Sequence, residues 1–199
     1  MAKLKDDRIE YRAFPVAELR ILREPDTGPT IIGHAAVFNV LSEELWGFRE
    51  RVLPGAFTTS LGGDVRALWN HDPNHVLGRT KNGSLSLVED AVGLAVSIRP
   101  PETQMARDAL VLIERGDVSQ MSFGFRTLSD RWHLEKGEEI RELVEVKLFD
   151  VSPVTFPAYP QTDVALRSLQ AWREAHPEMG RDPGWLRRRL ALQERLDRG

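Results

Sequence analysis

Short runs of alternating apolar and polar residues fill the chain up to about residue 160, and turn signals separate them. A period of two with β-branched and aromatic residues is typical of strands, and it predicts strands at residues 30–38, 64–70, 85–88, 92–98 and 118–125. Residues 103–115 have helical spacing instead, with Thr103 placed to cap a helix and Gly116 to end it. Pro54 predicts the start of a second, short helix. Many short strands with one or two helices favour an α+β fold, mainly an antiparallel β-barrel with flanking helices.

The strand at 118–125 has two unlike faces. Alternation places Met121, Phe123 and Phe125 on one face, which we expect to be buried. Ser122 and Gly124 fall on the other face. A residue without a Cβ lets another backbone approach closely, so we expect Gly124 to leave room for the main chain of a substrate.

This strand is predicted to continue into a long hairpin that turns at Lys136-Gly137 and returns along residues 143–151. On the returning strand, alternation places Asp150 on the same apolar face as Leu148. An unpaired carboxylate on a buried face is costly, so Asp150 needs a partner there. Glu145 falls on the other face and looks like half of a solvated pair with Lys147.

Two further turns are predicted between the central strands. Residues 71–75 contain Pro73 and follow a strand directly, so they are predicted to form a turn that presents His71. Asn82-Gly83 is typical of a tight hairpin.

Composition limits the function classes. The 199 residues carry a net charge of −3, which gives no reason to expect nucleic-acid binding. No apolar run approaches the roughly 20 residues of a membrane-spanning helix, and the N-terminus does not resemble a secretory signal. The absence of cysteine excludes disulfides, thiolate nucleophiles and cysteine-ligated metals, and it fits a reducing compartment.

A serine becomes a nucleophile only beside a base. Of the five histidines, His71 is the best candidate base for Ser122, because a turn on a rigid scaffold is a common place for reactive groups. The spacing of His71 and His75 also fits a zinc site on a helix, but Pro73 between them argues against helical geometry. No Gly-rich phosphate-binding loop occurs.

An orienting acid would hold the histidine in the correct tautomer. Asp150 and Glu145 both compete for this role. A purely structural Asp150 that accepts hydrogen bonds from nearby backbone N–H groups is an equally open interpretation.

Several segments, in this order along residues 30–160, resemble the prohead (capsid maturation) proteases of tailed phages. They are Gly33-His34-Ala35-Ala36-Val37-Phe38, Leu53-Pro54-Gly55-Ala56-Phe57, Leu68-Trp69-Asn70-His71-Asp72, Leu77-Gly78-Arg79, Gln120-Met121-Ser122-Phe123-Gly124-Phe125 and Phe149-Asp150-Val151-Ser152-Pro153-Val154-Thr155-Phe156-Pro157-Ala158-Tyr159. The resemblance implies a serine endopeptidase with a herpesvirus-assemblin-like fold, without cofactor or metal.

By position, the resemblance implies that Ser122 is the nucleophile, His71 the base and Asp150 the third member. Many relatives carry glutamate at the third position and the herpesvirus enzymes a second histidine, so Glu145, His133 and His75 stay as alternatives. Backbone N–H groups would stabilise the oxyanion, with Arg79 as an additional candidate.

The resemblance further implies that the enzyme trims the scaffolding segment of the major capsid protein, and itself, inside the immature procapsid in the host bacterial cytoplasm. The implied partners are that capsid protein and further copies of the enzyme, with no nucleic acid and no membrane. A non-enzymatic assembly or scaffold protein that keeps the protease fold is the alternative. A small-molecule hydrolase is disfavoured because Ser122 lacks the G-x-S-x-G elbow.

The pattern changes after residue 160. Prolines and glycines interrupt it, and residues 185–196 form an amphipathic, arginine-bearing stretch. We therefore expect a protease domain at 1–160 and a partly helical tail at 161–199. The tail is either a scaffold-targeting or self-cleaved extension, or a solvated helix packed loosely on the domain.

Overall fold

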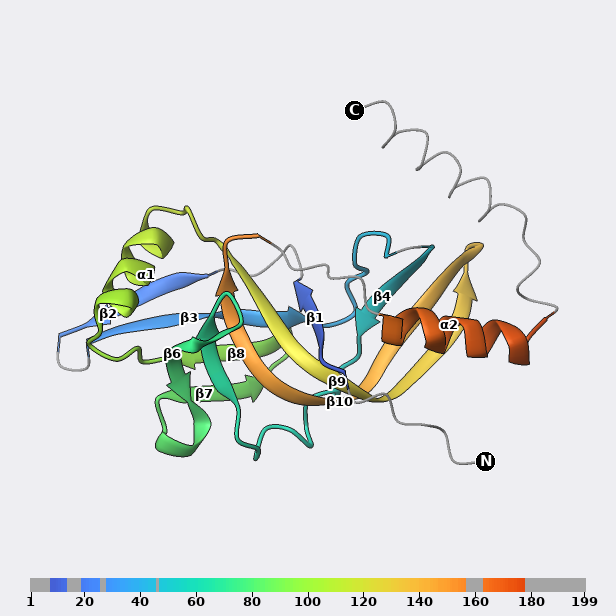
Figure 1. Ribbon diagram of the computed structural model, residues 1–199, viewed down its shortest axis with the longest axis horizontal. Helices are drawn as coiled ribbons and strands as arrows, with labels where there is room; N and C mark the ends of the chain where they lie inside the picture. The colour runs from blue at the N-terminus through green and yellow to red at the C-terminus, as the bar shows by residue number, and fades with distance from the viewer. Residues whose placement is uncertain (1–7, 14–18, 26–27, 46, 157–162, 178–199) are drawn as a thin grey trace, which may run out of the picture.

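The computed structural model describes residues 8–13, 19–25, 28–45, 47–156 and 163–177, which form ten strands, two α-helices and one short 3-10 helix (Figure 1). The strands are β1 (Glu10–Ala13), β2 (Arg20–Glu24), β3 (Gly28–Val37), β4 (Phe48–Val52), β5 (Arg66–Trp69), β6 (Asp72–Arg79), β7 (Leu85–Glu89), β8 (Gly93–Ile98), β9 (Gln120–Glu135) and β10 (Glu138–Val154). The helices are α1 (Gln104–Glu114), α2 (Asp163–Ala175) and the 3-10 turn η1 (Thr80–Asn82). The predicted α+β class is therefore confirmed.

The described strands form two sheets. The larger follows the order β1-β9-β10-β5-β6, with β4 paired to another part of β10, and the smaller follows β2-β3-β8-β7. Within the described ranges β1 and β6 remain the two ends of the larger path, so that sheet does not close on itself. The barrel and the assemblin-like arrangement are consequently not confirmed.

The long hairpin β9–β10 runs through the whole molecule, from the region of α1 to that of α2 (Figure 1). Its turn lies at Lys136-Gly137, as predicted, and both residues have positive φ angles of 53° and 80°. Two consecutive left-handed residues give the turn whose twist matches antiparallel strands. One half of β10 pairs with β4 and the other half pairs with β5, both in parallel.

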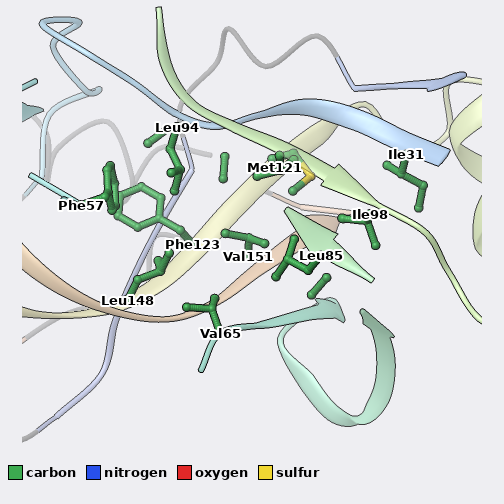
Figure 2. Packing of buried hydrophobic residues seen from close by; sticks show 14 of the residues in the cluster. Ile31, Phe57, Val65, Leu85, Leu94, Ile98, Met121, Phe123, Leu148 and Val151 are labelled. Carbon is green, nitrogen blue, oxygen red and sulfur yellow. The ribbon is translucent and has the colours of Figure 1, made fainter. Parts of the chain in front are cut away.

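The main core lies against one face of β9. Met121, Phe123 and Phe125 are fully buried, as their spacing predicted, and Phe57 packs edge-on against Phe123 at 5.4 Å between ring centroids (Figure 2). Helix α1 adds an apolar face made of Ala106, Ala109, Leu110 and Ile113. It begins after Thr103, whose side chain accepts a hydrogen bond from the Ala106 N–H, so the predicted cap is confirmed.

Three local predictions are wrong. The segment after Pro54 forms successive turns without a helix. The expected turn at 71–75 is mostly strand β6, because the turn itself is only two residues long. Asn82-Gly83 does not close a hairpin, since β6 and β7 on either side of it belong to different sheets.

Helix α2 covers the far end of the hairpin (Figure 1). Its buried Ala165 and Leu169 join a small core of Leu45, Phe48, Trp132 and Trp172. The indole N–H of Trp132 donates to Ser168 Oγ at 2.9 Å. Residues 185–196 lie outside the described residues, and the division at residue 160 stays a prediction.

A buried charge cluster of Glu10, Arg12, Glu50 and Arg141 anchors the edge strand β1. Arg141 donates to Glu10 at 2.8 Å and to Glu50 at 2.9 Å, and Arg12 donates to Glu50 at 2.8 Å. The cluster therefore joins β1, β4 and β10, strands that lie far apart in the sequence. Buried charges persist in a fold only when such partners surround them.

Candidate active site

Ser122 lies on β9 with a strand on either side. Its cross-strand neighbours are Ala13 on β1 and Ser152 on β10. The side chain is on the face opposite the apolar residues, as predicted, and Ser122 is 0% exposed. Position and orientation of this serine are thus fixed by continuous strand pairing.

His71 is presented by the two-residue turn between β5 and β6. Asn70 and His71 both have positive φ angles, of 53° and 59°, a combination that few residues other than glycine and asparagine adopt readily. Asn70 is held in this conformation by the end of β10. Its backbone N–H donates to the Pro153 carbonyl at 3.0 Å, and its side-chain oxygen accepts from the Thr155 N–H at 2.9 Å.

The structure brings the three predicted residues together. His71 Nε2 lies 2.7 Å from Ser122 Oγ, and His71 Nδ1 lies 2.5 Å from Asp150 Oδ1. The side chains of His71 and Asp150 are 11% and 8% exposed. A proton on Nδ1 is donated to the carboxylate, which leaves Nε2 as the acceptor for the serine hydroxyl. This is the geometry that an acid, a base and a nucleophile require.

A β-bulge puts Asp150 on this face of the sheet. Leu148 pairs with Phe125, but Asp150 pairs with Gly124, so the extra residue between them interrupts the alternation. The prediction that Asp150 shares the face of Leu148 is therefore wrong. The single inserted residue moves the carboxylate from the core face to the face of Ser122.

Ser152 is a further member of the site that the sequence did not suggest. Its hydroxyl donates to Asp150 Oδ1 at 2.8 Å and accepts from the His71 backbone N–H at 3.3 Å. Asp150 Oδ1 therefore accepts two hydrogen bonds, and Ser152 joins Asp150 to the turn that carries His71. Because the strand was predicted to end at residue 151, Ser152 fell just beyond it; in the structure β10 continues to Val154, so Ser152 follows Asp150 by two positions and shares its face.

The space above Gly124 is filled by the protein itself. A Cβ on this residue would overlap the Asp150 carboxylate and would lie 2.9 Å from Cε1 of Tyr11. The expectation that Gly124 admits a substrate main chain is therefore corrected. Its missing side chain gives room to the Asp150 carboxylate.

Tyr11 reaches the same place from β1. Its ring centroid lies 4.4 Å from that of His71, at an interplanar angle of 55°. Burial, and then the negative charge of Asp150, raise the pKa of the Tyr11 phenol, so the ring stays neutral. Nothing in the sequence pointed to Tyr11, because its approach depends on the non-local pairing of β1 with β9.

The alternative third residues do not join this site. Glu145 pairs in register with Ser129, farther along the hairpin. His133 lies 3.6 Å from Glu135, and His75 lies 3.1 Å from Asp72.

Arg79, the candidate oxyanion helper, is held by Asp64 at 2.7 and 2.6 Å. The hydrogen bonds from the Arg79 guanidinium also hold the pKa of the Asp64 carboxyl below its ordinary value.

In the described part of the chain, no group of three or more His, Asp or Glu side chains is arranged to hold a metal ion. The zinc alternative also loses its geometry, since the rings of His71 and His75 each bind a separate aspartate. No described helix is long and apolar enough to cross a membrane.

Comparison with known proteins agrees with the sequence motifs. A family model described as caudovirus prohead serine protease matches residues 17–175. No curated protein and no solved structure matches the chain. The matched region contains Ser122, His71 and Asp150, whereas β1 lies before it.

Proposed function

Since the chain belongs to the caudovirus prohead serine protease family, we propose that it is a capsid-maturation endopeptidase whose catalytic residues are Ser122, His71 and Asp150. The observation that carries this proposal is the hydrogen-bonded row from Asp150 through His71 to Ser122, at 2.5 and 2.7 Å. In this row the proposed nucleophile lies beside the proposed base, and the base lies beside the proposed acid.

In the proposed reaction, His71 Nε2 takes the proton of Ser122 as Oγ attacks the carbonyl carbon of the scissile peptide bond. His71 then returns this proton to the leaving amine, and an acyl-enzyme forms. Water then attacks the acyl carbonyl carbon as His71 takes its proton, the bond between that carbon and Oγ breaks, and His71 returns the proton to Ser122 as the acid product leaves. Asp150 remains ionised throughout and stabilises the imidazolium.

Gln120 supports an approach of the substrate from the side away from Asp150. It precedes Ser122 by two positions and shares its face, and its buried Oε1 has no hydrogen-bond partner among the residues that the structure describes. A buried acceptor left unpaired costs about 1–3 kcal/mol, and a substrate N–H placed there would recover this loss. Backbone N–H groups supply the oxyanion contacts in this proposal; Arg79 has no part in it.

The proposed substrate is the scaffolding segment of the phage major capsid protein, together with the enzyme's own chain. The enzyme would act inside the immature procapsid in the host bacterial cytoplasm, where copies of it would associate with one another and with the capsid protein. An assemblin-like barrel and a removable tail at 161–199 belong to the same proposal.

Co-expression with the major capsid protein of the same phage tests this function. The wild-type chain should yield a shortened capsid protein, visible on a gel and located by mass spectrometry, and Ser122→Ala and His71→Ala should yield none. Ser129→Ala, on the same strand but exposed, is the matched control and should trim normally. Trimming by Ser122→Ala would contradict the proposal. Shell formation that needs the chain, with no trimming by any variant, would favour the assembly-protein alternative.

A further inference from the structure

Strand β1 has a different role on each of its faces. Glu10 and Arg12 face the core side, where Arg12 lies over the Phe125 ring at 5.7 Å and both side chains belong to the buried charge cluster. Tyr11 and Ala13 face the other side, opposite Gly124 and Ser122. The ion pairs thus fix the strand, and the strand then holds Tyr11 over the site.

Tyr11 packs against His71 and lies beside the Asp150 carboxylate, the two groups that orient Ser122 in the proposed site. Its ring lies 4.4 Å from that of His71, and its Cε1 borders the same small space above Gly124 that the Asp150 carboxylate fills. These contacts are made by the aromatic ring. A ring placed there restricts the tilt of the imidazole and keeps water from the His71–Asp150 hydrogen bond, which is stronger in a dry environment.

We infer that Tyr11 is a positioning residue of this active site, acting through His71, so that β1 completes a site whose other members lie within the family-matched region. The inference rests on the proposed function, because it assigns Tyr11 to the serine chemistry described above. It also explains why a short edge strand is fixed by four buried charges. Displacing β1 would remove the wall of the site as well as part of the fold.

The rate at which a fluorophosphonate probe labels Ser122 measures this role without the capsid substrate. We expect Tyr11→Phe to label at a rate close to wild type, because it keeps the ring. Tyr11→Ala should label roughly 10- to 100-fold more slowly, as expected when a catalytic group is misplaced. Ile9→Ala, an exposed neighbour, is the matched control, and Ser122→Ala gives the background.

Tyr11→Leu separates positioning from packing, because leucine fills much of the space without a flat ring. We expect it to unfold at nearly the wild-type temperature and still label slowly. The proton of the His71–Asp150 hydrogen bond should give a far-downfield NMR signal in wild type and Tyr11→Phe, broadened by exchange with water in Tyr11→Leu. Wild-type labelling and signal in Tyr11→Leu would overturn the inference, as would slow labelling by Tyr11→Phe. If Tyr11→Ala does not fold, Tyr11→Leu alone decides. Absence of labelling in the wild type would instead count against the proposed function.

Discussion

Gly124 and Asp150 are cross-strand partners, and the carboxylate of Asp150 occupies the space that any side chain at residue 124 would need. The Asp150 carboxylate is thus accommodated by the absence of a side chain at residue 124, on the strand of Ser122. Because Ser122 precedes Gly124 by two positions, the same alternation that orients the serine also aligns this space with it.

Gly124→Ala should therefore disrupt the hydrogen bond between Asp150 and His71. The new methyl group must push the Asp150 carboxylate away from His71, so we expect turnover to fall by about 100-fold and the free energy of unfolding to fall by about 1–3 kcal/mol. Peptide cleavage and urea unfolding measure the two effects. Gly62→Ala, where a Cβ meets nothing within 4 Å, is the matched control and should change neither.

Asp150→Asn tests the identity of the acid. An amide in place of the carboxylate favours the wrong imidazole tautomer and no longer stabilises its charged form, so kcat should fall by roughly 10⁴-fold. Glu145→Gln should leave kcat unchanged, since Glu145 lies opposite Ser129 and away from His71. Undiminished turnover by Asp150→Asn would refute the assignment.

Ser152→Ala removes one of the two hydrogen bonds that Asp150 Oδ1 accepts and leaves the His71 N–H without its partner. A hydrogen bond to a charged group contributes about 1.5–3 kcal/mol, so kcat/KM should fall by roughly 10- to 100-fold. Because Ser152 acts through Asp150, the same change in an Asp150→Asn background should cost much less. Equal losses in both backgrounds would show that Ser152 acts independently.

Arg141→Met tests the cluster that anchors β1. The substitution leaves Glu10 and Glu50 buried with only Arg12 between them, and breaking such a pair costs about 3–5 kcal/mol. Arg23→Met is the matched control, because its pair with Glu114 is exposed and contributes at most about 1 kcal/mol. Similar urea midpoints for the two variants would contradict the importance of the cluster.

We expect Glu10 to make the free energy of unfolding depend on pH. Burial alone would raise its pKa, but Arg141, then Arg12 and Thr127, more than offset burial and hold the pKa below the ordinary value of 4.5. A carboxyl with a lowered folded-state pKa contributes stability above its ordinary pKa and loses it as the pH falls through the folded value. Urea unfolding should therefore show a steeper loss below pH 4.5 for wild type than for Glu10→Gln. Parallel curves would exclude this contribution.

Much of the local structure could be predicted from the sequence. The alternation of Met121, Phe123 and Phe125, the Lys136-Gly137 turn and the Thr103 cap are each determined by residues close together in the chain, and the structure has all three. The same alternation predicted that Ser122 lies on the face of the strand opposite these apolar residues. Its proximity to His71 was expected from family motifs, since spacing alone does not place a turn against a distant strand.

What could not be predicted depends on single-residue irregularities and on non-local pairing. The bulge before Asp150 reverses the face of the acid, and no composition signal marks it. The turn at Asn70-His71 lacks glycine, so its left-handed conformation was hidden. Tyr11 enters the site only because β1 pairs with a strand more than a hundred residues later in the chain.

The hydrogen bonds between Asn70 and the end of β10 have a consequence for how the enzyme fails on heating. They join the turn that carries His71 to the strand that carries Asp150, and strand pairing joins that strand to the strand of Ser122. Fraying of a single loop cannot separate the three groups, so the barrier to inactivation is that of opening the sheet itself. Activity and tertiary structure should be lost in one thermal transition. The amide protons of β9 and β10 should exchange with solvent at one global rate, equal to the rate at which activity is lost.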